Sequence, residues 1–246
     1  MAIKNNITFF SFSGIGKRAN NEDAYYSAII SDQNSSLFMV YDGVGGRNKG
    51  EIASALVCDS FKNFLETKPD FSDINWVNNA IKYTEQQFDL AMEQDSNTRG
   101  MASTLALVAF QEKNILIAHC GDSRVYHFRN KEILFQTKDH SYINWMIDRG
   151  EMTKEEAKTH PKRNVITRYI GGTQNPTKAD VQLITDWKAN DFILLCTDGF
   201  LEAWNNREVV RLMVPENEVD KMAEEMEDKC SLLSDDNYTA TLIKIN

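Results

Sequence analysis

The chain has 246 residues, of which 42% are hydrophobic and 26% charged, and its formal net charge is −9. This composition is ordinary for a globular protein with a sizeable core, and the acidic balance argues against nonspecific binding to nucleic acid. Phosphorylated ligands remain compatible with it, because a bound cation can reverse the charge locally. The four cysteines have no CxxC spacing, as expected for buried thiols in a reducing compartment. Every apolar run falls short of the ~18 residues of a membrane span. We therefore expect a single domain over residues 1–246, in a cytoplasmic monomer without membrane association.

The first half of the chain alternates strand-like runs with two amphipathic helices. The apolar run 37–41 leads directly into Asp42 and a glycine-dense turn that ends at Gly46. A carboxylate at the end of a buried strand has a rigid base, and glycines let another group approach the backbone closely. The periodicity predicts strands over 7–12, 25–30, 37–41, 103–110 and 115–119, and helices over 50–66 and about 74–93.

The second half begins with a hairpin and contains one long polar excursion. Residues 138–172 are polar and partly helical, with Thr153 as the expected N-cap of a short helix. A segment of this length between strands is often a lid or a substrate loop. The remaining elements are predicted as strands over 124–128, 132–136, 181–185, 192–196 and 239–245, and as helices over 207–213 and 218–230.

Several predicted strands are apolar on both faces, and residues 104–110 are the clearest case. Short hairpins imply antiparallel pairing, yet antiparallel sheets usually leave one face in water. Both faces of these strands must therefore be covered, one by the amphipathic helices and the other by a second sheet. The expected fold class is α+β, with two packed antiparallel sheets flanked by helices.

Carboxylates follow three of the predicted strands. Asp42 and Asp198 each end an apolar run and precede a glycine, and Asp122 follows a glycine at the end of another run. Two further acidic pairs, 22–23 and 235–236, precede strands. One Asp-Gly after a strand is usually only a turn, but carboxylates that converge from several strands need cations, because bare carboxylates repel one another. All-oxygen ligands suit Mg²⁺ or Mn²⁺, and two such ions ~3.5–4 Å apart could bridge a hydroxide. The pattern therefore indicates a divalent-metal hydrolase.

Short motifs in a fixed order cover nearly the whole chain, from Arg18 to Thr239. They are RANNEDA (18–24), DGVGG (42–46), GEIAS (50–54), MASTL (101–105), GDSRVY (121–126), DHS (139–141), HPKRN (160–164), TDG (197–199) and DNYT (236–239). With these motifs the chain resembles the metal-dependent protein phosphatases of the PP2C family, in their bacterial single-domain form. Each motif alone has low specificity, and the ordered set is highly specific.

The resemblance implies a four-layer α-β-β-α sandwich that hydrolyses phosphoserine and phosphothreonine on proteins. It also implies two core cations, Mn²⁺ or Mg²⁺, and a third, weaker metal site. By position, Asp42 would bridge the two core ions, and the carbonyl of Gly43 would bind one of them. Asp198 and Asp236 would bind the other. The remaining implied roles are Glu22 and Asp23 holding metal-bound waters, Asp122 with Asp198 forming the third site, Arg18 binding the substrate phosphate, and residues 138–172 forming a mobile flap.

The implied mechanism needs no protein nucleophile. Water bridging the two cations would lose a proton near neutral pH and attack phosphorus in line with the leaving seryl oxygen. Arg18 offers a planar fork that matches phosphate oxygens. The source of the leaving group's proton stays open, because Val44 stands where eukaryotic members carry a histidine. A water, His140 or His160 could serve instead.

Phosphorylated proteins are the implied substrates, and a bacterial Ser/Thr kinase is the implied partner. Two other interpretations stay open. One is a catalytically silent module that binds phosphoproteins or a kinase, although Asp42, Asp198 and Asp236 are all intact. The other is a phosphatase of a partner-switching or sporulation pathway, although such relatives usually carry attached sensor or membrane domains.

Overall fold

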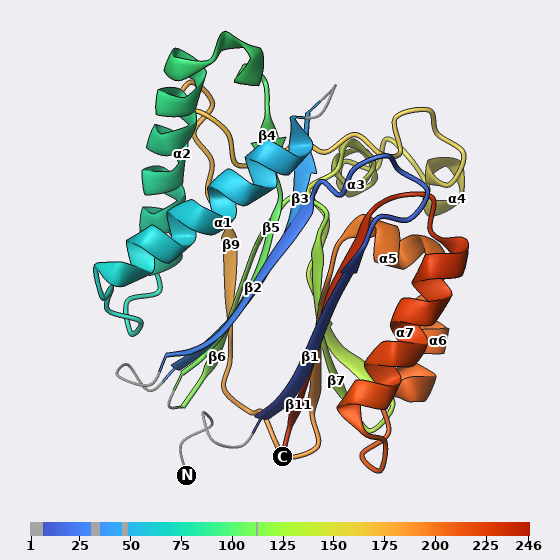
Figure 1. The fold of residues 1–246 in the computed structure, drawn as a ribbon. Helices are drawn as coiled ribbons and strands as arrows, with labels where there is room; N and C mark the ends of the chain where they lie inside the picture. Colours follow the sequence, from blue (N-terminus) through green and yellow to red (C-terminus); the bar gives the residue numbers. More distant parts are fainter. Residues whose placement is uncertain (1–6, 31–34, 46–48, 112) are drawn as a thin grey trace.

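A computed structural model of the chain describes residues 7–30, 35–45, 49–111 and 113–246. Figure 1 shows two antiparallel sheets packed face to face, with helices on the outer face of each. This is the expected α+β, four-layer α-β-β-α sandwich, so the fold prediction is confirmed. Within the described residues, every helix is too short or too polar to span a lipid bilayer.

One sheet has five strands in the order β1-β11-β10-β7-β8, and the other follows the order β2-β3-β5-β6-β9, with the short β4 paired to β3. The first sheet is made of β1 (Ile7–Gly14), β11 (Tyr238–Ile245), β10 (Phe192–Cys196), β7 (Arg124–Arg129) and β8 (Glu132–Gln136). The second is made of β2 (Asp23–Ile30), β3 (Ser35–Val44), β5 (Leu105–Phe110), β6 (Ile115–Cys120), β9 (Asp180–Ile184) and β4 (Ala102–Ser103).

The strand β3 shows why both strand faces are apolar. Leu37, Met39 and Tyr41 point into the core beneath the helices, whereas Phe38 and Val40 point into the core between the two sheets. All five side chains are fully buried. Because side chains alternate along a strand, one continuous apolar run serves two cores at once.

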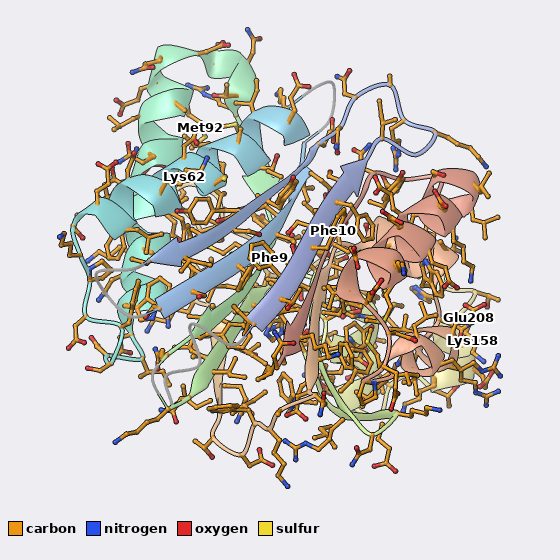
Figure 2. All side chains as sticks on the ribbon, turned by 60° about the horizontal axis from the view of Figure 1, so that its bottom comes forward. Phe9, Phe10, Lys62, Met92, Lys158 and Glu208 are labelled. Carbon is orange, nitrogen blue, oxygen red and sulfur yellow. The ribbon has the colours of Figure 1, made fainter. Side chains whose placement is uncertain are left out.

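The helices cover the two outer faces. Helices α1 (Gly50–Glu66) and α2 (Trp76–Gln94) lie on the second sheet, and α5 (Asp198–Ala203), α6 (Asn206–Leu212) and α7 (Val219–Leu233) lie on the first (Figure 1). Phe9 and Phe10 on β1, labelled in Figure 2, belong to different layers. Phe9 packs between the sheets with its ring 4.8 Å from that of Phe38, and Phe10 packs against the helical layer of the first sheet.

The segment between β8 and β9 carries α3 (Tyr142–Asp148) and α4 (Lys154–Ala157), and Figure 1 shows it beyond one end of the sandwich. Thr153 is the N-cap of α4, as predicted, and forms a reciprocal capping box with Glu156. A short 3₁₀ helix, η3 (Ser96–Thr98), follows α2.

Three details differ from the sequence prediction. Strand β3 continues to Val44, so Asp42 lies inside the strand rather than at its end. The expected strand 103–110 is interrupted at Thr104, because the Thr104 hydroxyl replaces its backbone carbonyl as the acceptor for the Asp42 N–H. Helix α5 begins at Asp198, where only a turn was expected. The last glycine of the predicted turn, Gly46, lies outside the described residues.

Candidate metal centre

Loops and strand ends of both sheets meet around a cavity of about 420 Å³. Of the eight residues predicted for the site, all but Asp23 line this cavity. They come from five separate places in the chain. Arg18 and Glu22 lie between β1 and β2, Asp42 and Gly43 on β3, Asp122 between β6 and β7, Asp198 at the start of α5, and Asp236 just before β11.

Both the backbone N–H and the backbone carbonyl of Asp42 form hydrogen bonds with the neighbouring residues 103 and 104. Its N–H donates to Thr104 Oγ1 at 3.0 Å, and its carbonyl accepts from the Thr104 N–H at 2.9 Å and from Ser103 Oγ at 3.0 Å. Thr104 Oγ1 also lies 2.6 Å from Ser123 Oγ, beside Asp122. The carboxylate of Asp42 therefore has a rigid base, as the sequence led us to expect.

Two facing glycines bring the Gly43 carbonyl close to the Glu22 carboxylate. A Cβ atom at Gly50 would lie 2.3 Å from Glu22 Oε2 and 2.5 Å from the Gly43 oxygen, and one at Gly43 would lie 1.9 Å from the Gly50 oxygen. Any side chain at either position would push the strand and the start of α1 apart. The close approach therefore requires glycine at both positions.

Asp23 is not part of the cavity lining. It is opposite Asp42 in the β2–β3 pairing, and its Oδ2 accepts a hydrogen bond from Thr197 Oγ1 at 2.8 Å. Burial raises the pKa of Asp23 to about 7, against the opposing effect of its hydroxyl donors. Of the predicted residues it is the one that the structure places outside the lining.

The carboxyl groups of the cavity are poorly compensated by the protein itself. Burial, followed by repulsion from Asp23 and Asp198, raises the pKa of Asp42 well above its usual value. Burial and repulsion from Asp236 raise the pKa of Asp198 to about 6, and burial and Asp198 raise that of Asp122 to about 7. Bound cations would stabilise the ionised carboxylates. A donor set made only of carboxylate and carbonyl oxygens fits Mg²⁺ or Mn²⁺.

Arg18 reaches the rim of this acidic site. Its Nη2 donates to Asp236 Oδ2 at 2.6 Å, and its side chain is 59% exposed. The backbone N–H of Asp236 in turn donates to Glu202 Oε2 at 3.1 Å. The guanidinium therefore stands between the predicted metal ligand Asp236 and solvent, where an incoming anion would meet it.

Comparison with known proteins identifies the family. The sequence profile of the family described as Protein phosphatase 2C matches residues 13–244. The chain belongs to the protein phosphatase 2C family. A Streptococcus pyogenes protein of protein phosphatase 2C type is 31% identical to it over 234 residues, 92% of each sequence. The serine/threonine protein phosphatase PstP of Mycobacterium tuberculosis is 30% identical over 201 residues, which make up 81% of this chain and 37% of PstP.

Solved structures of protein phosphatase 2C relatives share the fold. The serine/threonine phosphatase of S. agalactiae matches with a TM-score of 0.87 and 28% identity, over 98% of this chain and 100% of that one. The catalytic domain of PstP, in complex with two manganese ions, matches with a TM-score of 0.80 and 26% identity, over 98% of each chain. The resemblance found in the motifs is thereby confirmed.

Residues from the segment between β8 and β9 complete the cavity of this protein phosphatase 2C chain. Asn164 and Ile166 line it, as does Val44 from β3. No histidine of the described residues is part of the lining. His160 instead stacks on Tyr142, with the ring centroids 5.8 Å apart.

Asn237 is a positioning residue for which the sequence predicted no role. Its Oδ1 accepts from the Glu22 N–H at 2.8 Å, and its Nδ2 donates to the carbonyls of Ile15 and Asn20, both at 2.8 Å. One side chain thus joins the loop of Arg18 and Glu22 to the loop of Asp236. The DNYT motif contained this residue, but a motif match alone does not reveal which partners an amide has.

Proposed function

We propose that this protein phosphatase 2C chain hydrolyses phosphoserine and phosphothreonine on proteins, with Mn²⁺ or Mg²⁺ as cofactor. The observation that carries the proposal is the set of carboxylates, with the Gly43 carbonyl, that lines one cavity beside an arginine. Carboxylates without enough neighbouring positive charge favour the binding of divalent cations. An arginine at the rim can donate hydrogen bonds to the oxygens of a phosphoryl group. Two manganese ions in the PstP complex support the choice of metal.

The ligand assignments follow the positions of these residues. Asp42 would contact both core ions, the Gly43 carbonyl one, and Asp198 and Asp236 the other. Glu22 and Asp23 would act through water molecules, which agrees with the absence of Asp23 from the cavity lining. Asp122, together with Asp198, would hold a third ion. When bound, two divalent cations supply hydroxide near neutral pH and stabilise charge that develops on phosphoryl oxygens.

The chain's own contribution is to orient the phosphoryl group and to keep the carboxylates in place. Arg18 would turn from Asp236 toward the phosphate, because the cation would then compensate Asp236. Thr104 fixes the backbone of Asp42, and Asn237 fixes the loop of Arg18. These contacts fix the positions of the site residues before substrate binds. Such preorganisation lowers the activation free energy of the reaction.

The leaving seryl or threonyl oxygen must receive a proton. Val44 cannot provide one, and His140 and His160 do not line the cavity. We therefore assign this role to a solvent water in the cavity rather than to a side chain.

The proposal also covers a flap over the cavity, the oligomeric state, the cellular location and the partner. Residues 138–172 would form a flap, since Asn164 and Ile166 reach the cavity from this segment. A single domain over residues 1–246, a monomeric state, a cytoplasmic location and an opposing Ser/Thr kinase complete it. The free, buried cysteines agree with a reducing compartment. A catalytically silent binding module is not favoured, because all the predicted ligands are present around the cavity.

The direct test is phosphate release from a phosphothreonine peptide. The metal-free protein should be inactive, and Mn²⁺ should restore turnover. A tyrosine-phosphorylated peptide of the same sequence is the matched control and should be a much poorer substrate. No phosphate release from phosphothreonine or phosphoserine peptides at saturating Mn²⁺ or Mg²⁺, in protein that circular dichroism shows to be folded, would overturn the proposal.

A further inference from the structure

Outside the cavity, three side chains form a group: His119, His140 and Asp180. Potential ligand atoms of His119, His140 and Asp180 all lie within 4.8 Å of one another, and this is the one such group found among the described residues. The rings of His119 and His140 are stacked, with centroids 4.4 Å apart and an interplanar angle of 14°. A group of two histidines and a carboxylate suggests a second metal site, so the protons on the rings must be assigned first.

The hydrogen bonds show that this group is not a metal site. The backbone N–H of Gly121 donates to His140 Nδ1 at 3.1 Å, so the proton of the neutral ring must be on Nε2. That nitrogen donates to Asp180 Oδ2 at 3.1 Å and has no lone pair for a cation. Asp180 also accepts from Arg168 Nη1 at 2.5 Å, which already supplies a positive charge.

We propose that His140 is a positioning residue for Asp122, acting through the turn at Gly121. Two hydrogen bonds join His140 to Gly121: the Gly121 N–H donates to Nδ1, and the His140 N–H donates to the Gly121 carbonyl at 2.9 Å. Gly121 directly precedes Asp122 in the chain. The inference rests on the proposed function, because it takes Asp122 to be a metal ligand.

The turn is held between His140 and the strand that carries Asp42. Gly121 has a φ of +109°, and a Cβ atom there would lie 2.6 Å from Thr104 Cγ2. Thr104 in turn accepts the Asp42 N–H. Because Thr104 packs closely against one side of the turn, the hydrogen bond from the Gly121 N–H to His140 Nδ1 fixes the turn on its other side. Loss of that bond would let Asp122 move relative to Asp42.

His140 also joins this turn to the segment that reaches the cavity. Its carbonyl accepts from the Thr167 N–H at 2.7 Å, next to the cavity residue Ile166. Its Nε2 meets Asp180, the partner of Arg168 in the same segment. His140, near the start of the proposed flap, therefore links this segment to the Asp122 turn. Its Nδ1 accepts a hydrogen bond from the turn, whereas its Nε2 donates to Asp180.

Two substitutions separate these two hydrogen bonds. His140→Asn places an amide oxygen near the position of Nδ1 and keeps the acceptor for Gly121, but it loses the donor to Asp180. His140→Gln places an amide nitrogen near Nε2 and keeps that donor, but it loses the acceptor. His160→Gln is the matched control, because His160 lies in the same segment and does not line the cavity.

The measurement is calorimetric titration of the metal-free full chain with Mn²⁺. We expect a weak binding step in the wild type that Asp122→Asn abolishes. His140→Gln should weaken that same step by about 10–100-fold, the usual effect of losing a residue that supports a metal ligand, and should leave the tighter binding unchanged. His140→Asn and His160→Gln should bind as the wild type does.

Several results would overturn the inference. These are an unchanged weak step in His140→Gln, equal losses in the Asn and Gln variants, or wild-type binding by Asp122→Asn. None of them removes the phosphatase proposal, which phosphate release with Mn²⁺ tests separately.

A measurement on the wild type covers the case in which His140→Gln does not fold. The ¹⁵N spectrum of the His140 ring should show an unprotonated Nδ1, coupled across the hydrogen bond to the Gly121 amide. The ring signals should shift in the weak step of a titration with diamagnetic Mg²⁺. A protonated Nδ1, or ring signals that do not respond in that step, would contradict the role proposed for His140.

Discussion

Strand β10 has an aspartate near each end, and the two have different surroundings. Asp191, directly before the strand, is fully buried and accepts hydrogen bonds from Arg129 Nε at 2.7 Å and His127 Nε2 at 2.8 Å. Arg129 Nη2 at 2.8 Å and the backbone N–H of Lys188 at 2.9 Å add two further donors. Burial alone would raise the pKa of Asp191, but these donors lower it to about 2.

At the other end, Asp198 faces other carboxylates. Burial and repulsion from Asp236 and Glu202 raise its pKa to about 6, although hydrogen bonding with Asp42 opposes the rise. The two ends share a strand and a residue type, and they differ in whether the chain supplies the compensating charge. The Asp191 network is complete within the protein, whereas the cavity around Asp198 is suited to a cation from solution.

The largest expected effect comes from removing a carboxylate at the uncompensated end. Asp42→Asn should reduce phosphate release by more than about 100-fold, because even residues that only support metal ligands usually contribute 10–100-fold. The metal-free variant should be at least as stable as the wild type, since one of several mutually repelling carboxylates is gone. Phosphate release with Mn²⁺ and thermal unfolding without metal measure the two effects. Near-normal turnover would contradict the bridging role of Asp42.

The same substitution at the compensated end should act in the opposite way. Asp191→Asn should reduce the free energy of unfolding by about 3–5 kcal/mol, as expected when one partner of a buried ion pair is removed. Turnover per folded molecule should be unchanged, because Asp191 is not part of the cavity lining. Urea unfolding and active-site titration test this pair of outcomes. If Asp191→Asn were stable but inactive, the division between a structural and a functional end of β10 would be wrong.

The layers of the fold could be predicted from the sequence because burial leaves a periodic signal. The run 104–110 had no polar face, and that pattern required cover on both sides. The break at Thr104 could not be predicted, because threonine fits a strand and its hydrogen bond to Asp42 is a long-range contact. Helix α5 was missed because it is short and its first turn, Asp198-Gly199, has the composition of a tight turn.

The candidate site was predictable in its residue types and less so in its supports. Acidic residues next to strands indicated Asp42, Asp122 and Asp198, and the family motifs added Arg18 and the Gly43 carbonyl. Asn237 and His140 belong to the DNYT and DHS motifs, but their roles depend on the atoms with which they form hydrogen bonds. Amide and imidazole side chains can donate or accept, so only the fold reveals their roles.

The smallest of the expected effects is the pH dependence of the stability of the metal-free protein, which distinguishes Asp191 from the carboxylates of the cavity. Without metal, the pKa values of Asp122 and Asp198 are raised to about 7 and about 6, against ~3.9 in an unfolded chain. The folded protein therefore holds protons that the unfolded chain releases, and its stability should fall as pH rises from ~4 to ~7. Asp191 contributes no slope in this range, because its stabilisation is complete above ~3.9 and is lost only as pH falls toward about 2.

Thermal unfolding at pH 5 and pH 7, with and without Mn²⁺, measures this contrast. The metal-free protein should melt at a lower temperature at pH 7 than at pH 5. Mn²⁺ should raise the melting temperature more at pH 7, by ~5–10 °C at a 100-fold excess over Kd, because protons compete less for the carboxylates. Asp42→Asn should flatten the metal-free slope, and Asp191→Asn should lower the melting temperature at both pH values and leave the slope intact. His119 and His140, whose pKa values are lowered by burial, contribute a slope of the opposite sign, so the comparison of variants decides the source of the slope. If Asp42→Asn left the metal-free slope unchanged, the cavity carboxylates would not be that source.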